Sequence, residues 1–302
     1  MLKKLSAIHL SNAIVSPVLN QGIGGLYDES GTPVEESFHW SLNKKVIYLE
    51  DNFTGNQTAL ENDGRVVIWG GYHASHFGHF LLESLARLWI SAYSKHPIIW
   101  SNYWPLSFEW QKNIIEILDI KNELIQCSTP TRFKGVIVPS PGLIFDNYIN
   151  KDYLQFTQKY EFDNVSTPRY SKIWISRSSQ KNRAALNEEQ LELKLVALGW
   201  YILKPEEYSI KMQLEILSGA DVLAGIEGSA FHLLILLKHV KCKVLLIRRT
   251  KSIIYDLISH GLNLEHVNIF DHLDQLSYGS YEALNYKFKS LDKTLAIILA
   301  NS

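Results

Sequence analysis

The chain has 302 residues, of which 46% are hydrophobic and 20% charged, so a disordered polypeptide is excluded and the length suits two packed α/β halves. Lys and Arg number 30 against 31 for Asp and Glu, which argues against a general nucleic-acid or membrane-surface binder. The two cysteines, Cys127 and Cys242, can build neither a disulfide framework nor a thiolate zinc site, so a reducing compartment is the simpler interpretation.

The N-terminal residues 1–5 begin like a signal peptide, but His9, Ser11 and Asn12 interrupt the apolar run and no small-residue cleavage site follows. No apolar run approaches the roughly 18–20 residues that a membrane span needs. We therefore expect a cytoplasmic protein without a transmembrane segment, which could still lie peripherally on the inner membrane through a partner or substrate.

The first 60 residues alternate turn chemistry with short β-like runs such as 46–49. From residue 65 the rhythm changes to strand, helix and strand. We expect strands at 66–69, 97–100 and 136–138, and helices at 78–93 and 108–118. This alternation predicts a parallel sheet with crossover helices.

A polar stretch at 163–171 is the expected domain boundary, giving domains 1–165 and 166–302. Beyond it the same alternation returns. We expect strands at 172–176, 200–203, 221–224 and 243–247, and helices at 187–198, 209–217, 229–237 and 291–300. Gly199 would close the first of these helices, and the last could pack back on the N-terminal domain. Two Rossmann-like halves in tandem are the expected architecture.

The first candidate site lies on the helix at 78–93, where His79, Glu83 and Arg87 follow one another at i, i+4 and i+8 and so share one face. His76 lies one turn earlier, and the flanking positions are almost all apolar. Glu83 could accept a proton from one nitrogen of His79, so that the other nitrogen acts as a general base. The alternative is an i,i+4 salt bridge on a solvated face.

The second candidate site is the segment 221–232, where a strand, a glycine-containing loop and a helix follow one another. Gly225 and Gly228 would let backbone N–H groups approach a phosphate, with Ser229 as the N-cap of the helix. Glu227 could accept ribose hydroxyls, and His232 could reach the same ligand. The alternative is an ordinary strand-to-helix turn.

The third candidate site is the loop after the strand at 172–176, where Arg177, Lys181 and Arg183 could clamp a diphosphate. The alternative is a solvated basic loop. The aromatic residues Trp100, Tyr103, Trp104, Phe108 and Trp110 favour core packing over a sugar-stacking surface. The chain contains no Asp-x-Asp to hold a metal–diphosphate complex, and His73, His76 and His79 make only a weak metal candidate because no His-Glu-x-x-His accompanies them.

The order of the motifs along the chain is more specific than any one of them. The motifs are Gly-His-Phe-Leu-Leu-Glu-Ser-Leu-Ala-Arg-Leu at 78–88, Trp-Ile-Ser-Arg at 174–177, Arg183, Asn-Glu-Glu at 187–189, Pro-Glu-Glu-Tyr-Ser at 205–209, Ser-Gly-Ala-Asp-Val at 218–222, and Gly-Ile-Glu-Gly-Ser-Ala at 225–230 with His232. Together they resemble glycosyltransferase family 61, which includes bacterial capsular polysaccharide enzymes, over roughly residues 65–250.

The resemblance implies a GT-B-like α/β fold, with two Rossmann-like domains facing a cleft. Domain 1–165 would lie on the acceptor side, with His76 and Arg87 near the acceptor and His79 and Glu83 as the catalytic pair. Domain 166–302 would bind the nucleotide sugar. By the resemblance, Arg177 and Arg183 contact the diphosphate, and the loop 227–229 holds nucleotide or phosphate.

The implied reaction is metal-independent transfer of a sugar, with inversion, from a nucleotide-diphosphate donor to a glycan or lipid-linked glycan acceptor in surface polysaccharide synthesis. No cofactor is expected, and the donor is expected to be UDP-linked. The sequence departs from many relatives in having His79-Phe80 rather than His-Trp, and Gly228-Ser229-Ala230 rather than the Gly-Ala-Gly type of eukaryotic members. These departures bear on donor and acceptor more than on reaction class.

Mechanistically, His79 would take the acceptor proton, the arginines and the helix near Ser229 would stabilise the leaving diphosphate, and closure of the domains would exclude water. Glu83 or Glu227 could serve as the base instead. Two other functions fit the same frame: a different nucleotide-sugar enzyme, either an epimerase or a pyruvyltransferase, or a non-catalytic scaffold that binds nucleotide sugar.

Overall fold

The computed structural model describes residues 4–18, 24–41, 44–46, 53, 60–100, 106, 108–162, 168–181, 183–276 and 285–302. The chain divides into two compact units, Met1–Lys159 and Tyr160–Ser302. The expected boundary at 165 and most of the expected strand at 46–49 lie outside the described residues. Within the described ranges, no helix is long and apolar enough to cross a membrane.

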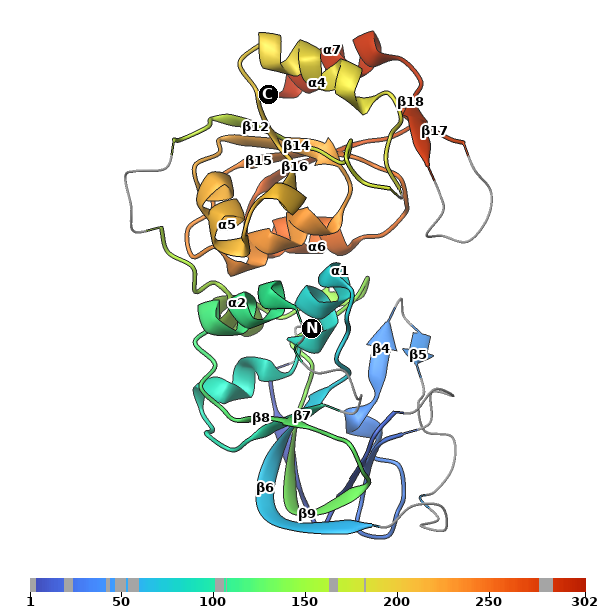
Figure 1. The fold of residues 1–302 in the computed structure, drawn as a ribbon, viewed down its shortest axis with the longest axis vertical. Coiled ribbons are helices and arrows are strands. Elements are labelled where there is room, and N and C mark those ends of the chain that lie inside the picture. The colour runs from blue at the N-terminus through green and yellow to red at the C-terminus, as the bar shows by residue number, and fades with distance from the viewer. Residues whose placement is uncertain are drawn as a thin grey trace. The chain divides into compact units, whose positions relative to one another are not determined.

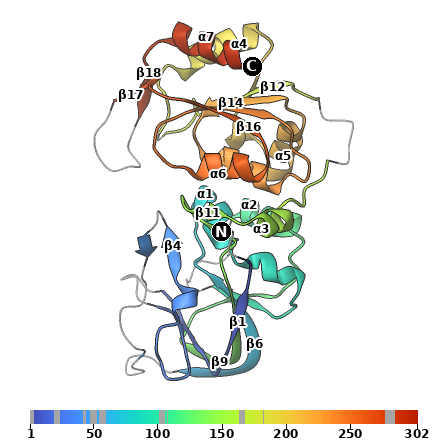
Figure 2. The ribbon, with the colours of Figure 1, turned by 180° about the vertical axis from the view of Figure 1, so that it is seen from behind.

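The N-terminal unit is built around one mixed sheet, which in the described part of the chain has seven strands. Four of them run parallel in the order β9-β6-β7-β8, and β1, β2 and β3 extend the sheet by antiparallel pairing. The strands are β1 (Ala7–Ser11), β2 (Ile14–Ser16), β3 (Gly25–Tyr27), β6 (Glu61–Gly71), β7 (Ile98–Trp100), β8 (Leu124–Gln126) and β9 (Thr131–Pro139). The pairing of β1 with β9 can be followed in Figure 2.

Shorter elements complete the N-terminal unit. They are η1 (Glu35–Ser37), the hairpin β4 (His39–Ser41) and β5 (Lys44–Val46), α1 (Phe77–His79), η2 (Phe80–Ser84), η3 (Leu88–Ala92), α2 (Glu109–Ile117), the hairpin β10 (Leu143–Ile144) and β11 (Tyr148–Ile149), and α3 (Lys151–Thr157). The predicted strands at 66–69, 97–100 and 136–138 and the helix at 108–118 are confirmed, and these strands run parallel as predicted, while β1, β2 and β3 add antiparallel pairing to the sheet. The short strands before residue 60 pair antiparallel: β2 with β3, β4 with β5, and β1 and β2 with β9.

Side chains along each strand point alternately to the two faces of the sheet, and this decides which of them form the core. Val67 and Trp69 on β6 and Val136 and Val138 on β9 point into one buried cluster. The register pairs Val67 with Val136, so these large side chains meet across the parallel ladder. β6 and β9 thereby fix the positions of the segments that follow them, which carry the polar residues described below.

The C-terminal unit is a parallel sheet in the order β13-β12-β14-β15-β16. Its strands are β12 (Lys172–Ile175), β13 (Tyr201–Leu203), β14 (Val222–Ile226), β15 (Lys243–Ile247) and β16 (Glu265–Ile269). Helices cover both faces: α4 and α7 lie on one and α5 and α6 on the other (Figure 1). Because both faces are covered, the inner strands β12, β14 and β15 are almost wholly apolar.

The helices of this unit are α4 (Glu188–Ala197), α5 (Ile210–Ser218), α6 (Ile254–Gly261), α7 (Leu291–Asn301) and the short 3₁₀ segments η4 (Pro205–Glu207) and η5 (Ser229–Leu236), with a hairpin of β17 (Leu273–Gln275) and β18 (Tyr286–Phe288). The predicted helix limits hold where capping chemistry sets them. The Ser209 side chain accepts from Met212 N at the start of α5, and Gly199 takes φ +81° just beyond α4. The C-terminal helix α7 belongs to this unit, where Ile298 joins the core beside α4.

The strand order is what positions a ligand site in this unit. Numbered by appearance in the chain, the five strands follow the order 2-1-3-4-5, so the connections leave in opposite directions on either side of β12 and β14. In open α/β sheets of this kind, ligands bind beyond the carboxyl ends of the strands at that switch point. The segments that follow β12 and β14 are those that carry Arg177 and residues 227–229.

Candidate functional site

The segment predicted as one helix at 78–93 is helical but broken. One turn of α-helix (α1) leads into a π-helical stretch (η2), a turn at 85–87 and a 3₁₀ segment (η3). The wider π-helical turn shifts the residues after it relative to an α-helical register. His79 and Glu83 still meet, and Arg87 lines the same small cavity as Glu83.

His79 and Glu83 form a hydrogen-bonded pair, with 2.6 Å between Nδ1 and Oε2. The imidazole is half exposed, whereas the Glu83 side chain is only 5% exposed. An ionised carboxylate can only accept, so Glu83 holds the proton of His79 on Nδ1 and leaves the lone pair on Nε2. This is the tautomer that a general base requires.

A second histidine, which sequence reasoning missed, shares the same carboxylate. His39, at the start of β4, places Nε2 3.4 Å from Glu83 Oε1. Burial would raise the pKa of Glu83, but the interactions with His39 and His79 outweigh it and lower the pKa to about 2. Glu83 is therefore a carboxylate at every physiological pH. A small cavity of about 20 Å³, lined by His39, Tyr72 and Arg87 among others, adjoins it.

Arg87 is buried in the fold. Its guanidinium donates to the carbonyls of Pro139 and, at 3.1 Å, Phe38, and burial lowers its pKa to about 10. Gly71 makes room for it: with φ +87°, a Cβ there would lie 3.3 Å from Arg87 Cδ. Because Phe38 precedes His39, Arg87 anchors the segment that brings His39 to Glu83. Its expected place on the acceptor side stays a prediction.

The remaining histidines of the first candidate site have separate environments. His76 is exposed, and its ring packs edge-on against that of His79 at 5.3 Å. His73 is buried against Phe80 and Trp100, and burial lowers its pKa to about 4. Among the described residues, no three His, Cys, Asp or Glu side chains lie close enough to hold a metal ion.

The aromatic run is divided between the core and the surface. Trp100 is buried, and Trp110 packs edge-on against Phe77 and Phe80 while its ring stacks on that of Phe108. Tyr103 and Trp104 lie outside the described residues. Core packing is confirmed for Trp100, while Trp110 is half-buried among aromatic rings.

In the C-terminal unit, the segments after β12 and β14 meet as the strand order requires. Arg177, just beyond β12, lies against Gly228, where an added Cβ would come within 2.6 Å of Nη1. Gly228 has extended backbone, so its lack of a side chain matters for this close approach and not for its conformation. The second and third candidate sites are therefore one site.

The loop after β12 is held by buried contacts. Glu188 accepts from the Arg177 amide at 3.1 Å and from Trp174 Nε1 at 2.9 Å, and burial raises its pKa to about 8. Arg177 Nε donates to the carbonyl of Arg183 at 3.1 Å, and Arg183 adopts φ +60°, a left-handed conformation that costs a non-glycine residue free energy. Lys181 is exposed on the same loop.

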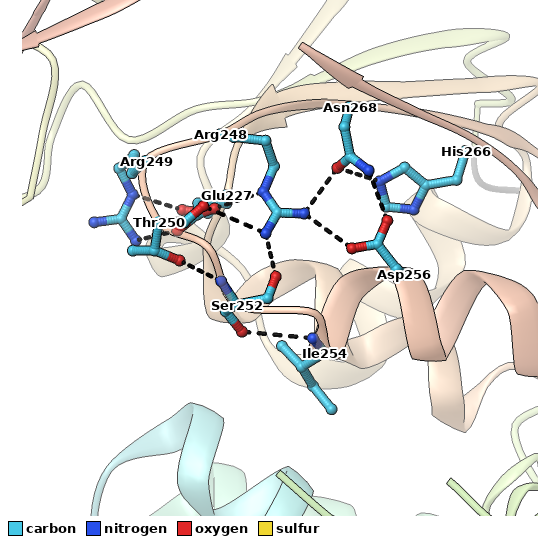
Figure 3. Close-up of polar contacts among 9 residues, drawn as sticks. All are labelled: Glu227, Arg248, Arg249, Thr250, Ser252, Ile254, Asp256, His266 and Asn268. Atoms are coloured by element: carbon cyan, nitrogen blue, oxygen red, sulfur yellow. Dashed lines mark hydrogen bonds and ion pairs between the residues drawn. The ribbon is translucent and has the colours of Figure 1, made fainter. Parts of the chain in front are cut away.

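Glu227 is buried, and its carboxylate is held by two arginines that follow β15. Arg248 Nε donates to Oε2 at 3.0 Å, and Arg249 Nη2 lies 3.9 Å from Oε1 (Figure 3). Arg249 Nε also donates to the Glu227 carbonyl at 3.1 Å. With its carboxylate so engaged, Glu227 orients arginines in this structure, and acceptance of ribose hydroxyls stays a prediction.

Three other predicted site residues have contacts that differ from those expected. Gly225 lies within β14, where a Cβ would be 2.7 Å from the Ile175 carbonyl, so it serves strand packing and not the approach of a ligand. Ser229 begins a 3₁₀ segment and is not its N-cap, because Gly228 takes that position without a side-chain bond. His232 is buried, with its ring 5.2 Å from that of Tyr255.

Arg248, Arg249 and Asn268 are residues of this edge that sequence reasoning missed. Arg248 binds Asp256 at 3.2 Å, Asn268 at 2.8 Å and the Ser252 carbonyl as well as Glu227 (Figure 3). Its guanidinium also lies 5.5 Å from the centre of the Tyr255 ring. The signal available was position: Arg248 and Arg249 directly follow the predicted strand 243–247, as Arg177 follows 172–176.

The fold and the site define the class. Arginines and a glycine beyond the carboxyl ends of parallel strands, at a switch point, are typical of α/β proteins that bind phosphorylated ligands. The model of the family described as Glycosyltransferase 61 matches residues 77–245. The chain therefore belongs to glycosyltransferase family 61, which supports a transferase that uses a sugar donor and a glycan acceptor.

Two other comparisons add no argument about function. A search of curated proteins found no match. One solved structure, the bacterial iron-containing dodecameric glycosyltransferase TibC from enterotoxigenic E. coli H10407, is similar over 80% of this chain and 74% of its own, at 10% identity and a TM-score of 0.31. A similarity at that level says nothing further about this chain.

Proposed function

We propose that the protein is an inverting, metal-independent glycosyltransferase. It moves a sugar from a nucleoside-diphosphate donor to a glycan or lipid-linked glycan acceptor in the synthesis of a surface polysaccharide. The family match supports glycosyl transfer over an epimerase, a pyruvyltransferase or a scaffold. The resemblance to the bacterial members of the family favours a capsular or lipopolysaccharide-type product. A UDP-linked donor is proposed because UDP is the commonest nucleotide of such donors and carries two phosphates for the paired arginines.

One observation carries the proposal: Arg177, Gly228 and Arg249 meet beyond the carboxyl ends of β12, β14 and β15. Inverting transfer breaks the bond between the anomeric carbon and a phosphate oxygen, and the departing diphosphate takes the electron pair. Fixed guanidinium groups stabilise the charge that develops, because they need no reorganisation when the bond breaks. Arginine also matches phosphate geometry with paired donors.

The acceptor hydroxyl needs a base, and His79 in the N-terminal unit has the arrangement of one. Glu83 holds Nδ1–H, so Nε2 can take the hydroxyl proton while the oxygen attacks the anomeric carbon. The carboxylate then stabilises the imidazolium that forms, in the manner of other His–carboxylate pairs. His39 on the opposite carboxylate oxygen keeps Glu83 ionised.

The experiment is a transfer assay with a panel of nucleotide sugars and lipid-linked oligosaccharide acceptors, run with and without EDTA. We expect one donor to give a product heavier by one sugar residue, with unchanged yield in EDTA and with inverted anomeric configuration by NMR. Epimerised donor, a pyruvyl ketal, retention of configuration or abolition of activity by EDTA would each contradict the proposal.

A further inference from the structure

We propose that Arg249 is a third arginine of the diphosphate site, in addition to Arg177 and Arg183. The inference rests on the proposed function, since it assigns a residue to the same donor site. Arg249 comes directly after β15, on the far side of β14 from Arg177. No motif in the sequence singles it out.

The burial of Arg249 is the first argument. Its side chain is only 4% exposed, yet Nη1 has no hydrogen-bond partner. In Figure 3 this nitrogen points away from Glu227, the residue that holds the rest of the group. A buried guanidinium nitrogen without an acceptor is costly, so such a group marks a place where an anionic ligand can supply one.

The neighbourhood of Arg249 is the second argument. Arg249 and Arg177 contact the same dipeptide, since Arg249 Nε donates to the Glu227 carbonyl while Arg177 lies against Gly228. Burial, and after it the charge of Arg249, lower the pKa of Arg177 to about 10. Two cations that repel each other across one turn are stabilised by an anion that binds both.

The charge balance of this edge is the third argument. Among the described residues, Arg177, Arg183, Arg248 and Arg249 gather here with the carboxylates of Glu227 and Asp256, and burial raises the pKa of Glu188 to about 8. Arg248 is fully engaged by Glu227, Asp256, Asn268 and Ser252. Arg249 Nη2 lies 3.9 Å from the carboxylate of Glu227, and a diphosphate can supply the acceptor that Nη1 lacks.

The ring of Tyr286 packs against the Arg249 guanidinium and restricts its position. The Arg249 guanidinium lies 5.5 Å from the centre of this ring. Tyr286 in turn exchanges backbone hydrogen bonds with Ala184 and Leu186, directly beyond Arg183. The pairing of Tyr286 with residues 184–186 therefore connects Arg249 to the loop that carries Arg183. The turn at Glu227–Gly228 connects Arg249 to Arg177, so the three arginines belong to a common site.

The test is calorimetric binding of UDP, GDP, CDP and dTDP, and of the corresponding monophosphates, to wild type and to R249Q, R249K, R177Q and R169Q. For the diphosphate that binds wild type, we expect R249Q to lower the affinity by roughly 10- to 100-fold, which is the range expected for loss of a hydrogen bond to a charged group. The affinity for the corresponding monophosphate should fall much less. R249K, which keeps the charge but not the paired donors, should fall between wild type and R249Q.

R169Q is the matched control, because it removes an exposed arginine from the opposite, amino-terminal edge of the same sheet, where Arg169 pairs with Asp221. Thermal unfolding identifies variants that fold, and R249K carries the test if R249Q does not. If wild type binds none of the four diphosphates, the proposed function itself fails. If R177Q weakens binding while folded R249Q and R249K match wild type, the proposed function stands and the assignment of Arg249 is overturned.

Discussion

At the scale of single residues, one buried carboxylate organises the candidate catalytic centre. Glu83 is 9% exposed and is approached by His79 on one oxygen and by His39 on the other. The i,i+4 spacing predicts the first contact, since it survives the change from α- to π-helical winding. The second contact joins two segments far apart in the chain, and no local pattern in the sequence could reveal it.

The first prediction concerns the pH dependence of stability. The folded pKa of Glu83 is about 2, below its ordinary value of 4.5, so its stabilising contribution is present above pH 4.5 and is lost as pH falls toward 2. The shift corresponds to about 3 kcal/mol. Urea unfolding of wild type and E83Q between pH 2 and 7 measures it. The difference in free energy of unfolding between wild type and E83Q should shrink as pH falls. A difference that stays constant would show that Glu83 does not titrate in this way.

The second prediction concerns turnover by the same pair. If Glu83 acts through His79, then E83Q and H79A should each lower kcat, and the double variant should be no slower than H79A alone. Steady-state kinetics with the donor and acceptor found in the transfer assay provides the measurement. Additive losses in the double variant would mean that the two side chains act independently.

The third prediction tests the close approach of Arg177 to Gly228. In G228A the new methyl group displaces the guanidinium without straining an extended backbone, so nucleoside-diphosphate affinity should fall by roughly tenfold with little change in Tm. G64A is the control, since a Cβ at Gly64 meets nothing within 4 Å. Unchanged affinity in folded G228A would show that Arg177 is not positioned by this contact.

At the scale of elements, the sequence predicts strands and capped helices better than it predicts irregular segments. The strands of the C-terminal sheet are short apolar runs bounded by turns, and Ser209 and Gly199 mark helix limits by local chemistry. The broken helix around His79 and the 3₁₀ segment after Gly228 keep an apolar pattern that looks α-helical. Tertiary packing sets their winding, and periodicity does not record it.

The fourth prediction concerns the contact between two strands. Gly225 lies in β14 opposite β12, and a Cβ would come within 2.7 Å of the Ile175 carbonyl and 3.2 Å of Phe231. Because backbone atoms on one side cannot move aside cheaply, G225A should destabilise the protein by roughly 1–3 kcal/mol, as overpacked cores do. Urea unfolding with G64A as the control checks this value. A cost as small as that of G64A would contradict the packing role given to Gly225.

At the scale of the whole molecule, the two units carry different parts of the proposed chemistry. The His39–Glu83–His79 group belongs to Met1–Lys159, and the arginine site belongs to Tyr160–Ser302. The tandem α/β organisation follows from the alternation of elements along the chain. The alternation of elements does not predict the mixed N-terminal sheet or the role of Arg248 and Arg249. Antiparallel pairing and contacts at a sheet edge depend on which strands become neighbours in the fold.

The central claim is that the carboxyl edge of the C-terminal sheet binds a nucleoside diphosphate through arginines and without a metal ion. Calorimetric titration of UDP, GDP, CDP, CMP and dTDP into wild type, R177A and H79A, with and without EDTA, tests it most directly. We expect one diphosphate to bind, EDTA to change nothing, H79A to bind as wild type does, and R177A to lose about 1.5–3 kcal/mol. Absence of nucleotide binding by wild type, or binding that EDTA abolishes, would contradict the claim.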